Sequence, residues 1–396
     1  MRTVFTTGFV FITFALAVSA EPGQGIHYGS WTISPYVDMS ATYDSNVNQS
    51  RSDVKGDVFG DATLGLRVGY SSYQLEFNGL GFLSGRKYAD VTENDFTAGG
   101  DLLRLKYGNR DQIAIEVDQT YRHITDIDRY GSEAAVAGVS PDSVLDVSAR
   151  SQRDIMQAGI SAGRNLTDKL ELDAGYRFDD VNYDQSALAD LRNHIGQIEA
   201  AYKITDKSAG LLTVKGAVQE NRRTDDSANY YAARLGMRTR STDKLTFKGS
   251  AGVQHYSPPS GDSETGFNFD LVGSWVATER IGVEAGGRNG SQMSSLYANN
   301  GTDYQIFWLG TTYRINQSIS TTLSGAYRID DYMNPVDSER GQVDRKDKGF
   351  AARVRADYQA PAKFLKVYGE ASYEDASSNV EGYSDTRVAI GAILSY

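Results

Sequence analysis

The sequence predicts an all-β protein: a single antiparallel, up-and-down transmembrane β-barrel of about 18 strands, with short periplasmic turns and longer extracellular loops. Three observations lead to this fold class. Apolar and charged residues alternate along many stretches, the connections between the stretches alternate in length, and the chain holds 40 Gly and 25 Tyr. Alternation at period two separates the two faces of a strand. Gly and Tyr at this level suit close-packed barrel walls and interfacial rings.

The first residues predict a secretory signal peptide. Arg2 precedes an apolar stretch, and Val18-Ser19-Ala20 ends it with small residues at positions −3 and −1 of a cleavage site. A membrane anchor is the alternative, but the stretch is shorter than the roughly 20 residues that a spanning helix needs. We therefore expect residues 1–20 to be removed, residues 21–30 to form a short periplasmic leader and residues 31–396 to form a barrel in the bacterial outer membrane.

The predicted strands follow one another from Trp31 to the C-terminus. In one of them, Leu170 and Leu172 alternate with Glu171 and Asp173, so that the apolar and charged side chains occupy opposite faces. We expect strands to start near Trp31, Asp57, Tyr73, Phe96, Ile113, Gln152, Leu170, His194, Leu211, Asn229, Leu245, Gly266, Ile281, Asp303, Ile319, Gly349, Leu365 and Thr386.

The connections decide between a barrel and a soluble sandwich, because both folds predict the alternation. The short connections are 165–169, 205–207, 241–244, 277–280, 316–318 and 360–363. Several contain Thr-Asp-Lys, and we expect their Asp and Asn side chains to bond the turn backbone. The long polar connections are 46–55, 89–95, 126–151, 182–193, 257–264, 294–302 and 331–348. Segregation of short turns and long loops is typical of outer-membrane barrels. Whether residues 126–150 fold inward and constrict the lumen stays an open alternative.

Aromatic residues also fit a membrane barrel. The last strand alternates through Val388, Ile390, Ala392, Leu394 and Tyr396, which resembles the assembly signal of bacterial outer-membrane barrels, although Phe is the usual last residue. This implies the barrel-assembly machinery as a partner, with outer-membrane lipid and lipopolysaccharide around the barrel. We expect interfacial girdles of Tyr70, Tyr107, Tyr202, Trp275 and Tyr313 near the short turns and of Tyr43, Tyr121, Phe178, Phe267 and Tyr304 near the long loops.

The charged positions of the strands define the expected pore lining. The acidic ones are Glu116, Asp118, Glu171 and Asp173, and the basic ones are Arg234, Arg238, Arg240, Lys248, Arg288, Arg328, Arg353 and Arg355. On lipid each charge would cost about 2–4 kcal/mol at mid-depth, so this face is expected to line an aqueous lumen. Two interpretations stay open: a basic wall selects anionic solutes, or the charges pair across strands and keep the wall hydrated.

Composition offers little for catalysis or for nucleic acid binding. The chain has no Cys and four His, which excludes disulfides, thiolate metal sites and Cys nucleophiles and leaves no recognisable His motif. Paired carboxylates such as Asp179-Asp180 and Asp330-Asp331 lack calcium-loop spacing and are interpreted as solvated rim charge. Gly99-Gly100 and Gly286-Gly287 lie within predicted strands, where bulges or tight packing explain them better than phosphate binding. The net charge of −11 argues against nucleic acid binding, and no catalytic residue, metal site or cofactor is predicted.

The first predicted hairpin carries a family resemblance. Ser34-Pro35-Tyr36-Val37 leads to Tyr43-Asp44-Ser45-Asn46-Val47 and then to Asp61-Ala62-Thr63-Leu64-Gly65-Leu66-Arg67. This segment resembles the opening of the beta-barrel porin type-two family, with Asp61-Ala62 in place of the common Pro-Gly step. The resemblance implies an outer-membrane barrel of a kind often associated with exopolysaccharide production and export, and it implies no catalytic residues.

The expected function is a porin-like outer-membrane channel that passes saccharides or assists exopolysaccharide export. Polysaccharide or periplasmic export proteins are then the expected partners. A structural or adhesive surface barrel with a narrow lumen is the alternative, and an outer-membrane enzyme comes third. Many charged lumen residues favour a channel, whereas an inserted segment that blocks the pore would favour the structural barrel.

Overall fold

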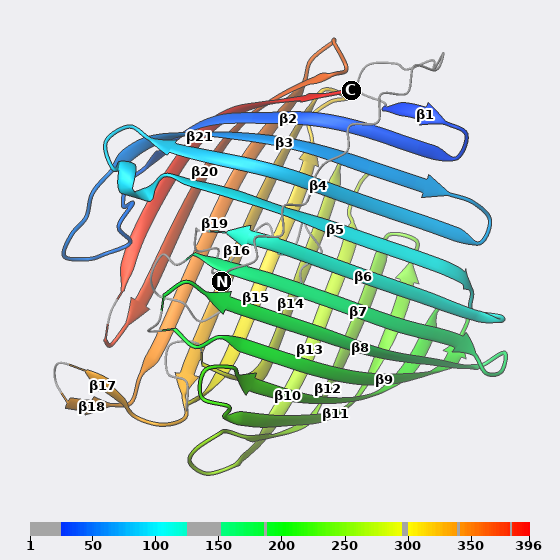
Figure 1. The fold of residues 1–396 in the computed structure, drawn as a ribbon. Coiled ribbons are helices and arrows are strands. Elements are labelled where there is room, and N and C mark those ends of the chain that lie inside the picture. Colours follow the sequence, from blue (N-terminus) through cyan, green and yellow to red (C-terminus); the bar gives the residue numbers. More distant parts are fainter. Residues whose placement is uncertain (1–24, 125–151, 186–187, 295–299, 339–340, 381) are drawn as a thin grey trace, which may run out of the picture.

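The computed structural model describes residues 25–124, 152–185, 188–294, 300–338, 341–380 and 382–396. Within these residues, eighteen long antiparallel strands form one closed barrel, which confirms the predicted fold class (Figure 1). Each long strand pairs with the next one along the chain. The last strand pairs with the first, Ser395 lying opposite Tyr36 and Arg387 opposite Asp44, and this pairing closes the wall.

The barrel strands are β2 (Trp31–Asp44), β3 (Asp57–Ser71), β4 (Leu75–Tyr88), β5 (Phe96–Asn109), β6 (Ile113–Ile124), β7 (Arg153–Asn165), β8 (Leu170–Tyr183), β9 (Leu191–Thr205), β10 (Ser208–Asn221), β11 (Ser227–Thr242), β12 (Leu245–Ser257), β13 (Glu264–Val276), β14 (Ile281–Met293), β15 (Gly301–Arg314), β16 (Ile319–Tyr332), β19 (Lys346–Gln359), β20 (Leu365–Ser378) and β21 (Tyr383–Ser395). Every one of them starts within three residues of its predicted position. The period-two pattern locates strands well because it depends only on neighbouring residues.

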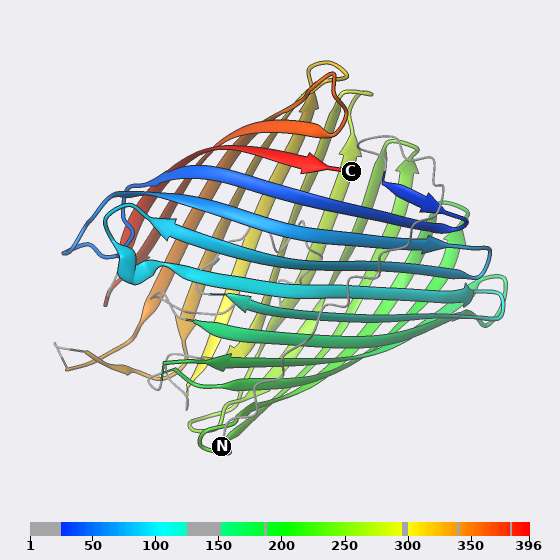
Figure 2. The ribbon, with the colours of Figure 1, turned by 45° about the horizontal axis from the view of Figure 1, so that its top comes forward.

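Three shorter strands were not predicted. β1 (Ile26–Tyr28) pairs with the beginning of β2, within the stretch expected to be a leader. β1 and β21 lie along the same edge of β2, because β21 reaches only as far as Tyr36 (Figure 2). β17 (Val336–Ser338) and β18 (Gly341–Val343) form a separate hairpin in the loop between β16 and β19. A single 3-10 turn, η1 (Thr92–Asn94), interrupts the loop after β4.

The connections segregate by rim, but less strictly than predicted. Both ends of the barrel sheet, at β1 and at the end of β21, lie on the rim with the short turns. The loops 222–226 and 379–382 lie on the opposite rim and are nevertheless short. Segment 126–150, for which an inward fold was left open, lies outside the described residues. The sequence predicted the two rims because most long connections are polar. The length of a connection alone, however, does not assign every connection to its rim.

The turn chemistry differs from the prediction. In the Thr-Asp-Lys turns the Thr hydroxyl, not the Asp carboxylate, accepts hydrogen bonds from the turn backbone. Thr167 Oγ1 accepts from the N–H of Leu170 at 3.0 Å, and Thr205 Oγ1 accepts from Lys207 at 3.2 Å. Asn316 does act as predicted, since its Oδ1 accepts from Ile319 at 2.8 Å. The Asp side chain thus stays available to solvent at the rim.

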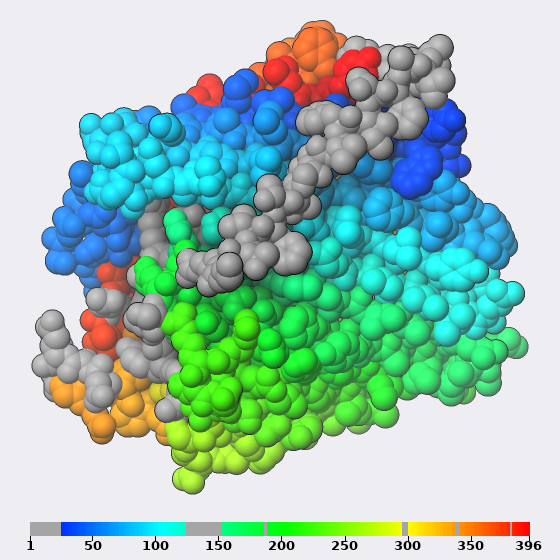
Figure 3. Space-filling model, in the orientation of Figure 1, coloured from blue at the N-terminus to red at the C-terminus, as the bar shows by residue number. Residues whose placement is uncertain are grey.

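The outer face of the wall is apolar. Leu64, Leu235 and Ile390 are between 60% and 70% exposed and lie on alternate positions of their strands. In the coloured part of the surface in Figure 3, side chains fill the spaces between neighbouring strands. Most of the predicted girdle residues are exposed, such as Tyr202 at 53%. Tyr304 is a wrong prediction, because it is 7% exposed and lines an interior pocket.

No helix in the described part of the chain is long and apolar enough to cross a membrane.

Candidate functional site in the barrel interior

Long-range ion pairs identify the inner face of the barrel. Arg238 on β11 donates to Glu171 on β8, although β9 and β10 lie between these strands. Lys248 on β12 likewise reaches Glu199 on β9, with 2.9 Å between Nζ and Oε2. Side chains can span two intervening strands only on the concave side of a curved sheet. Because side chains alternate along each strand, every second residue near these pairs points into the barrel.

One interior charge cluster lies at the short-turn end of β8. The Glu171 side chain is 8% exposed and contacts Arg238, Lys203 and Arg110, the last two at 3.4 Å. Asp173 accepts from Arg110 Nη2 at 2.7 Å. Two carboxylates therefore meet three cations, and the cluster ties β8, β9 and β11 to the turn after β5. Charge-assisted hydrogen bonds of this kind are about twice as strong as neutral ones.

A second cluster lies on β19 and β20. Arg353 donates to Glu370, and Arg355 lies 3.3 Å from the same carboxylate. Arg355 Nε also contacts Asp357 at 3.1 Å, and its guanidinium stacks 3.8 Å from the centre of the Tyr368 ring. A basic wall was one of the two interpretations left open for these arginines. Their charge is instead compensated locally by two carboxylates.

The remaining predicted residues mostly meet opposite charges as well. The pairs are Glu116 with Arg104, Arg328 with Asp330, and Arg240 with Asp243 at the short-turn rim. At least nine of the twelve predicted pore-lining residues thus form ion pairs. Asp118 lies opposite Arg104 in the ladder and packs against Gly159. These contacts support the interpretation in which charges pair across the wall.

A recurrent spacing, which the sequence analysis missed, produces many of these pairs. Arg and Asp two residues apart, on one strand or at its end, share a face and contact each other. The pairs and their shortest distances are Arg177–Asp179 at 3.1 Å, Arg328–Asp330 at 2.6 Å, Arg345–Asp347 at 2.8 Å, Arg355–Asp357 at 3.1 Å and Asp385–Arg387 at 2.8 Å. Asp179 and Asp330 are therefore buried ion-pair members, and their assignment as solvated rim charge was wrong. The signal was visible in the sequence as Arg-x-Asp or, at residues 385–387, as Asp-x-Arg.

Arg234 and Arg288, two of the residues predicted to line the pore, line a polar interior pocket. The pocket has a volume of about 60 Å³ and lies where β9, β10 and β11 face β13, β14 and β15. Its lining is Asn193, Ile195, Gln197, Lys215, Ala217, Gln219, Tyr230, Arg234, Asp270, Arg288, Asn289, Ser291, Gln292 and Tyr304. Arg234 Nη1 donates to Asn268 Oδ1 at 3.1 Å, and Arg288 lies opposite Asp270 in the ladder. The sequence placed the two arginines on one face but could not bring them together.

The end of β14 separates from β13 near this pocket, while it stays paired with β15 as far as Met293. The ladder between β13 and β14 stops at Asp270 and Arg288, although both strands continue. The Asn289 side chain replaces the missing ladder: its Oδ1 accepts from Phe269 N–H at 2.7 Å, and its Nδ2 donates to the Phe267 carbonyl at 2.6 Å. Further along, Met293 N–H donates to a side-chain oxygen of β10 at 2.7 Å. The strand end therefore bends into the barrel.

A buried apolar cluster forms where this strand end enters. Its members are Ala189, Leu191, Ala217, Ala228, Tyr230, Ala232, Tyr256 and Met293, with Ile195 and Met333 packed against them. Met293 and Tyr256 are 2% and 0% exposed. The cluster joins strand ends and loops of the long-loop rim across the interior. The cluster therefore fills one side of the lumen between the polar pocket and the long-loop rim. No periodicity in the sequence predicted this filling.

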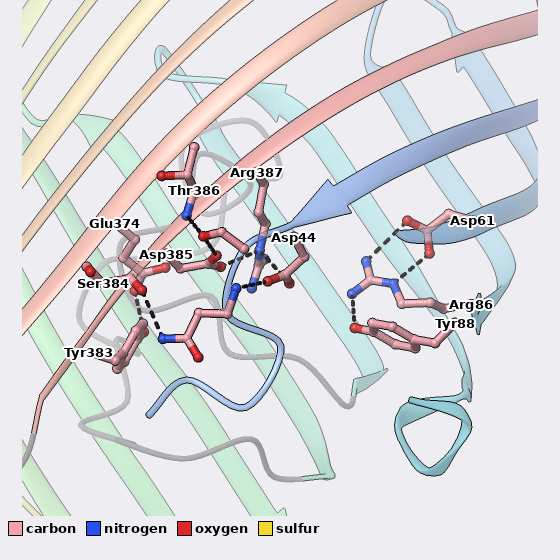
Figure 4. A network of polar contacts seen from close by, with 12 residues as sticks. Asp44, Asp61, Arg86, Tyr88, Glu374, Tyr383, Ser384, Asp385, Thr386 and Arg387 are labelled. Atoms are coloured by element: carbon pink, nitrogen blue, oxygen red, sulfur yellow. Dashed lines mark hydrogen bonds and ion pairs between the residues drawn. The ribbon is translucent and has the colours of Figure 1, made fainter. Parts of the chain in front are cut away.

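The seam between β2 and β21 carries a polar network, shown in Figure 4. Arg387 on β21 lies 3.2 Å from Asp44 and 2.8 Å from Asp385, and both carboxylates are almost fully buried. Ser45 Oγ donates to Asp385 and accepts from the Thr386 N–H at 2.8 Å. Asp44 and Ser45 belong to the Tyr-Asp-Ser-Asn element of the family resemblance. This element therefore joins the first strand to the last.

The rim loops are tied to one another by similar pairs. Arg223, in the loop after β10, contacts Asp190 at 2.9 Å and donates to the Tyr183 carbonyl at 2.8 Å. The hydrogen bonds that Arg223 donates to the Asp190 carboxylate raise the pKa of Arg223 above its ordinary value. In the described residues, no group of three or more His, Cys, Asp or Glu side chains is arranged to hold a metal ion.

Comparison with known proteins places these features in a family. A family model described as "Putative beta-barrel porin 2" matches residues 21–396. No curated protein matches the chain. Among solved structures, Pseudomonas aeruginosa OpdK with vanillate is 10% identical, with 92% of this chain and 99% of that chain covered and a TM-score of 0.47. Acinetobacter baumannii OccAB4 is 10% identical, covers 92% and 98%, and has a TM-score of 0.45.

Proposed function

The chain belongs to the family described as "Putative beta-barrel porin 2" and is a porin-like outer-membrane barrel, and on this premise we propose that it passes saccharides or assists exopolysaccharide export. The observation that carries the proposal is the chemistry of the interior. Charged side chains, amides and hydroxyls line it, and they can exchange hydrogen bonds with a hydroxyl-rich solute. The apolar side chains face outward, where lipid would contact them.

The ion pairs also bear on how such a solute would move. Compensated charges keep a wall wetted without holding an anion or a cation strongly, because each cation is already neutralised by its carboxylate. Transient contacts with hydroxyl groups can then follow one another along the wall. We propose that the predicted acidic and basic residues line this path as pairs, rather than as one basic and one acidic wall.

Several further expectations belong to this proposal. Residues 1–20 act as a cleaved signal peptide, and Val388, Ile390, Leu394 and Tyr396 form the signal that the barrel-assembly machinery reads. These four side chains are between 37% and 64% exposed on one face of β21, so a partner could contact them before the barrel closes. Outer-membrane lipid and lipopolysaccharide surround the finished barrel, and periplasmic export proteins are its partners in polysaccharide export.

A structural or adhesive surface barrel is the second candidate. The apolar cluster around Met293 and Tyr256 favours it, because this cluster fills one side of the interior near the long-loop rim. A barrel filled in the same way on all sides would hold loops at the cell surface without passing solutes.

Single-channel recording separates the two candidates. The purified full chain is inserted into planar bilayers, and its conductance is measured with and without neutral and acidic oligosaccharides. A channel gives stable conductance steps that oligosaccharides interrupt for measurable times. A barrel that inserts and gives no conductance would contradict the transport proposal and leave the structural one.

A further inference from the structure

The outer face of β8, β9 and β10 changes character near the long-loop rim. These three strands follow one another in one wall of the barrel (Figure 1). Along the middle of this wall the outward positions are apolar, such as Ile198 and Val214, which are 54% and 50% exposed. Nearer the rim, the positions of the same parity are Asp180, Arg192 and Glu220. The apolar wall therefore ends in a belt of ionic side chains on its outer face.

The belt residues lie at one level on the three strands. Asp180 lies opposite Arg192 in the ladder between β8 and β9, and Arg192 lies opposite Glu220 in the ladder between β9 and β10. The change is also abrupt, since Phe178 precedes Asp180 by two residues and Val218 precedes Glu220 by two residues. Two residues span only about 7 Å along a strand. The outer face thus has a sharp boundary between apolar and ionic side chains.

Two guanidinium groups share one carboxylate within this belt. Arg192 Nε lies 3.5 Å from Asp180 Oδ1, and Nη1 of Arg222, in the loop after β10, lies 3.2 Å from Asp180 Oδ2. Arg222 also donates to Asn182 Oδ1 at 2.5 Å. The Asp180 side chain is 14% exposed, whereas those of Arg192 and Arg222 are 34% and 39% exposed. The carboxylate therefore holds both guanidinium groups from the protein side.

These ion pairs orient the two arginines without using all of their donors. Glu220 is the second carboxylate beside them, 4.0 Å from Arg192 Nη1, so the two cations are balanced by two anions. A guanidinium group carries five N–H donors. In the described part of the chain, side-chain contacts involve Nε and Nη1 of Arg192 and Nη1 of Arg222. An incoming oxyanion can therefore accept directional hydrogen bonds from both arginines while Asp180 stays bound.

An aromatic group lies next to the ionic boundary on the apolar side. Tyr176 Oη lies 2.7 Å from His194 Nδ1, and the rings of Phe178 and His194 are 5.2 Å apart. The Arg192 guanidinium lies 5.8 Å from the centre of the Phe178 ring. Aromatic side chains mark the level at which the hydrocarbon of a membrane meets its headgroups. The belt beyond these rings is therefore at the depth of the headgroups.

The two ends of these strands differ. At the short-turn end the outward positions stay apolar or aromatic, since Tyr202, Ile204 and Leu212 are 53%, 65% and 47% exposed. The belt of Asp180, Arg192, Glu220 and Arg222 thus belongs to the rim that is expected to face the cell exterior. Lipid in the outward leaflet of an outer membrane is lipopolysaccharide, a glycolipid whose sugar head carries phosphate groups.

We propose that Arg192 and Arg222 bind a phosphate on the sugar head of lipopolysaccharide, while its acyl chains pack along the apolar wall beside them. The inference rests on the orientation given under the proposed function and adds a lipid site to the outer face. Guanidinium forks bind phosphate oxygens through paired, directional hydrogen bonds. The Asn182 amide beside Arg222 can bond sugar hydroxyl groups in the same head.

Native mass spectrometry of the purified full chain in detergent counts the lipid molecules that it binds. The probes are lipid A with two phosphates, dephosphorylated lipid A and phosphatidylglycerol. Arg192→Gln together with Arg222→Gln should lower the fraction of barrel that carries bisphosphorylated lipid A at least fivefold. Dephosphorylated lipid A should bind the wild type and this double variant equally weakly.

A matched control removes the same charge from the opposite rim. Arg280→Gln together with Arg314→Gln changes two exposed side chains at the short turns and should alter lipid A binding less than twofold. Heat-modifiable migration on gels verifies that each variant folds. Equal losses in the two double variants would overturn the inference, as would equal binding of all three lipids to the wild type. Dimers that dissociate only when Arg192 and Arg222 are replaced would assign the belt to contact between copies of the chain and overturn it as well.

Conductance in planar bilayers reports on the proposed function separately. A folded barrel that conducts but does not bind lipid A would overturn the lipid site and leave the channel. A barrel that binds lipid A through Arg192 and Arg222 and gives no conductance would support the lipid site and contradict transport.

Discussion

At the scale of single residues, the face of the wall decides what a side chain does. Leu64 and Thr63 are adjacent on β3, yet Leu64 is 60% exposed on the outer face, while Thr63 donates to Ser84 of the neighbouring strand at 2.9 Å on the inner face. The same type of substitution should therefore have opposite consequences at the two positions. Parity also explains why Tyr304 is not a girdle residue, because it lies two residues before Ile306 on β15 and both side chains are buried on the inner face.

We expect Leu64→Arg to destabilise the barrel by about 2–4 kcal/mol, because it places a charge on lipid near the middle of the strand. Thr63→Arg places the same charge on the inner face and should lose little beyond its hydrogen bond. Unfolding by urea in lipid vesicles, followed by tryptophan fluorescence, measures both. Equal losses at the two positions would contradict the assignment of faces.

The seam gives a second prediction at this scale. Arg387→Met leaves the buried carboxylates of Asp44 and Asp385 without the cation between them, and removal of one partner from a buried ion pair costs about 3–5 kcal/mol. We expect the temperature at which the folded barrel shifts its gel mobility to fall accordingly. Lys346→Met at the same rim breaks a half-exposed pair with Asp331 and should cost at most about 1 kcal/mol. A fall no larger than that of this control would show that the seam does not depend on Arg387.

At the scale of strands and turns, small local features adjust a regular pattern. β14 begins as an ordinary barrel strand and separates from β13 after Arg288, where the Asn289 side chain continues the pairing in place of the backbone. Two glycines precede this point. They allow Trp308 and Phe307, on opposite faces of β15, to lie close against β14.

Gly286→Ala should destabilise the barrel by about 1–3 kcal/mol, because the new methyl group overlaps Trp308 and approaches the Leu271 carbonyl to 2.7 Å. The matched control is Gly310→Ala on β15, where an added Cβ meets nothing within 4 Å. Urea unfolding of both variants measures the difference. If both variants unfolded like the wild type, the indole would not need the glycine.

At the scale of the whole molecule, one closed sheet has two different rims. The short turns of one rim are held by Thr and Asn side chains, and the other rim carries longer loops tied by pairs such as Arg223 with Asp190. This asymmetry predicts which rim faces the cell exterior. Long loops are expected outside and short turns in the periplasm.

Cysteine labelling of intact cells measures the orientation. Asp262→Cys, in the exposed loop after β12, should react with a membrane-impermeant maleimide, whereas Asp243→Cys, in the turn before β12, should react only after the cells are opened. Asp262 is preferable to Gly261, whose φ of +90° favours glycine and whose Cβ would approach Asn334. Reversed labelling would place the long loops in the periplasm.

The sequence by itself determined the strands, their number and, apart from exceptions such as Tyr304, the face on which a strand residue lies. These properties follow from period-two alternation and from the spacing of turns, which are local, so Glu171 and Arg238 could be placed on inner faces without knowing the fold. Arg-x-Asp pairs are equally local and could have been predicted. Only the tertiary structure decided that β8 and β11 come within reach of each other, that the end of β14 turns inward, and that the Tyr-Asp-Ser-Asn element meets the last strand. These contacts depend on the curvature and closure of the sheet, which bring together residues that no local pattern relates.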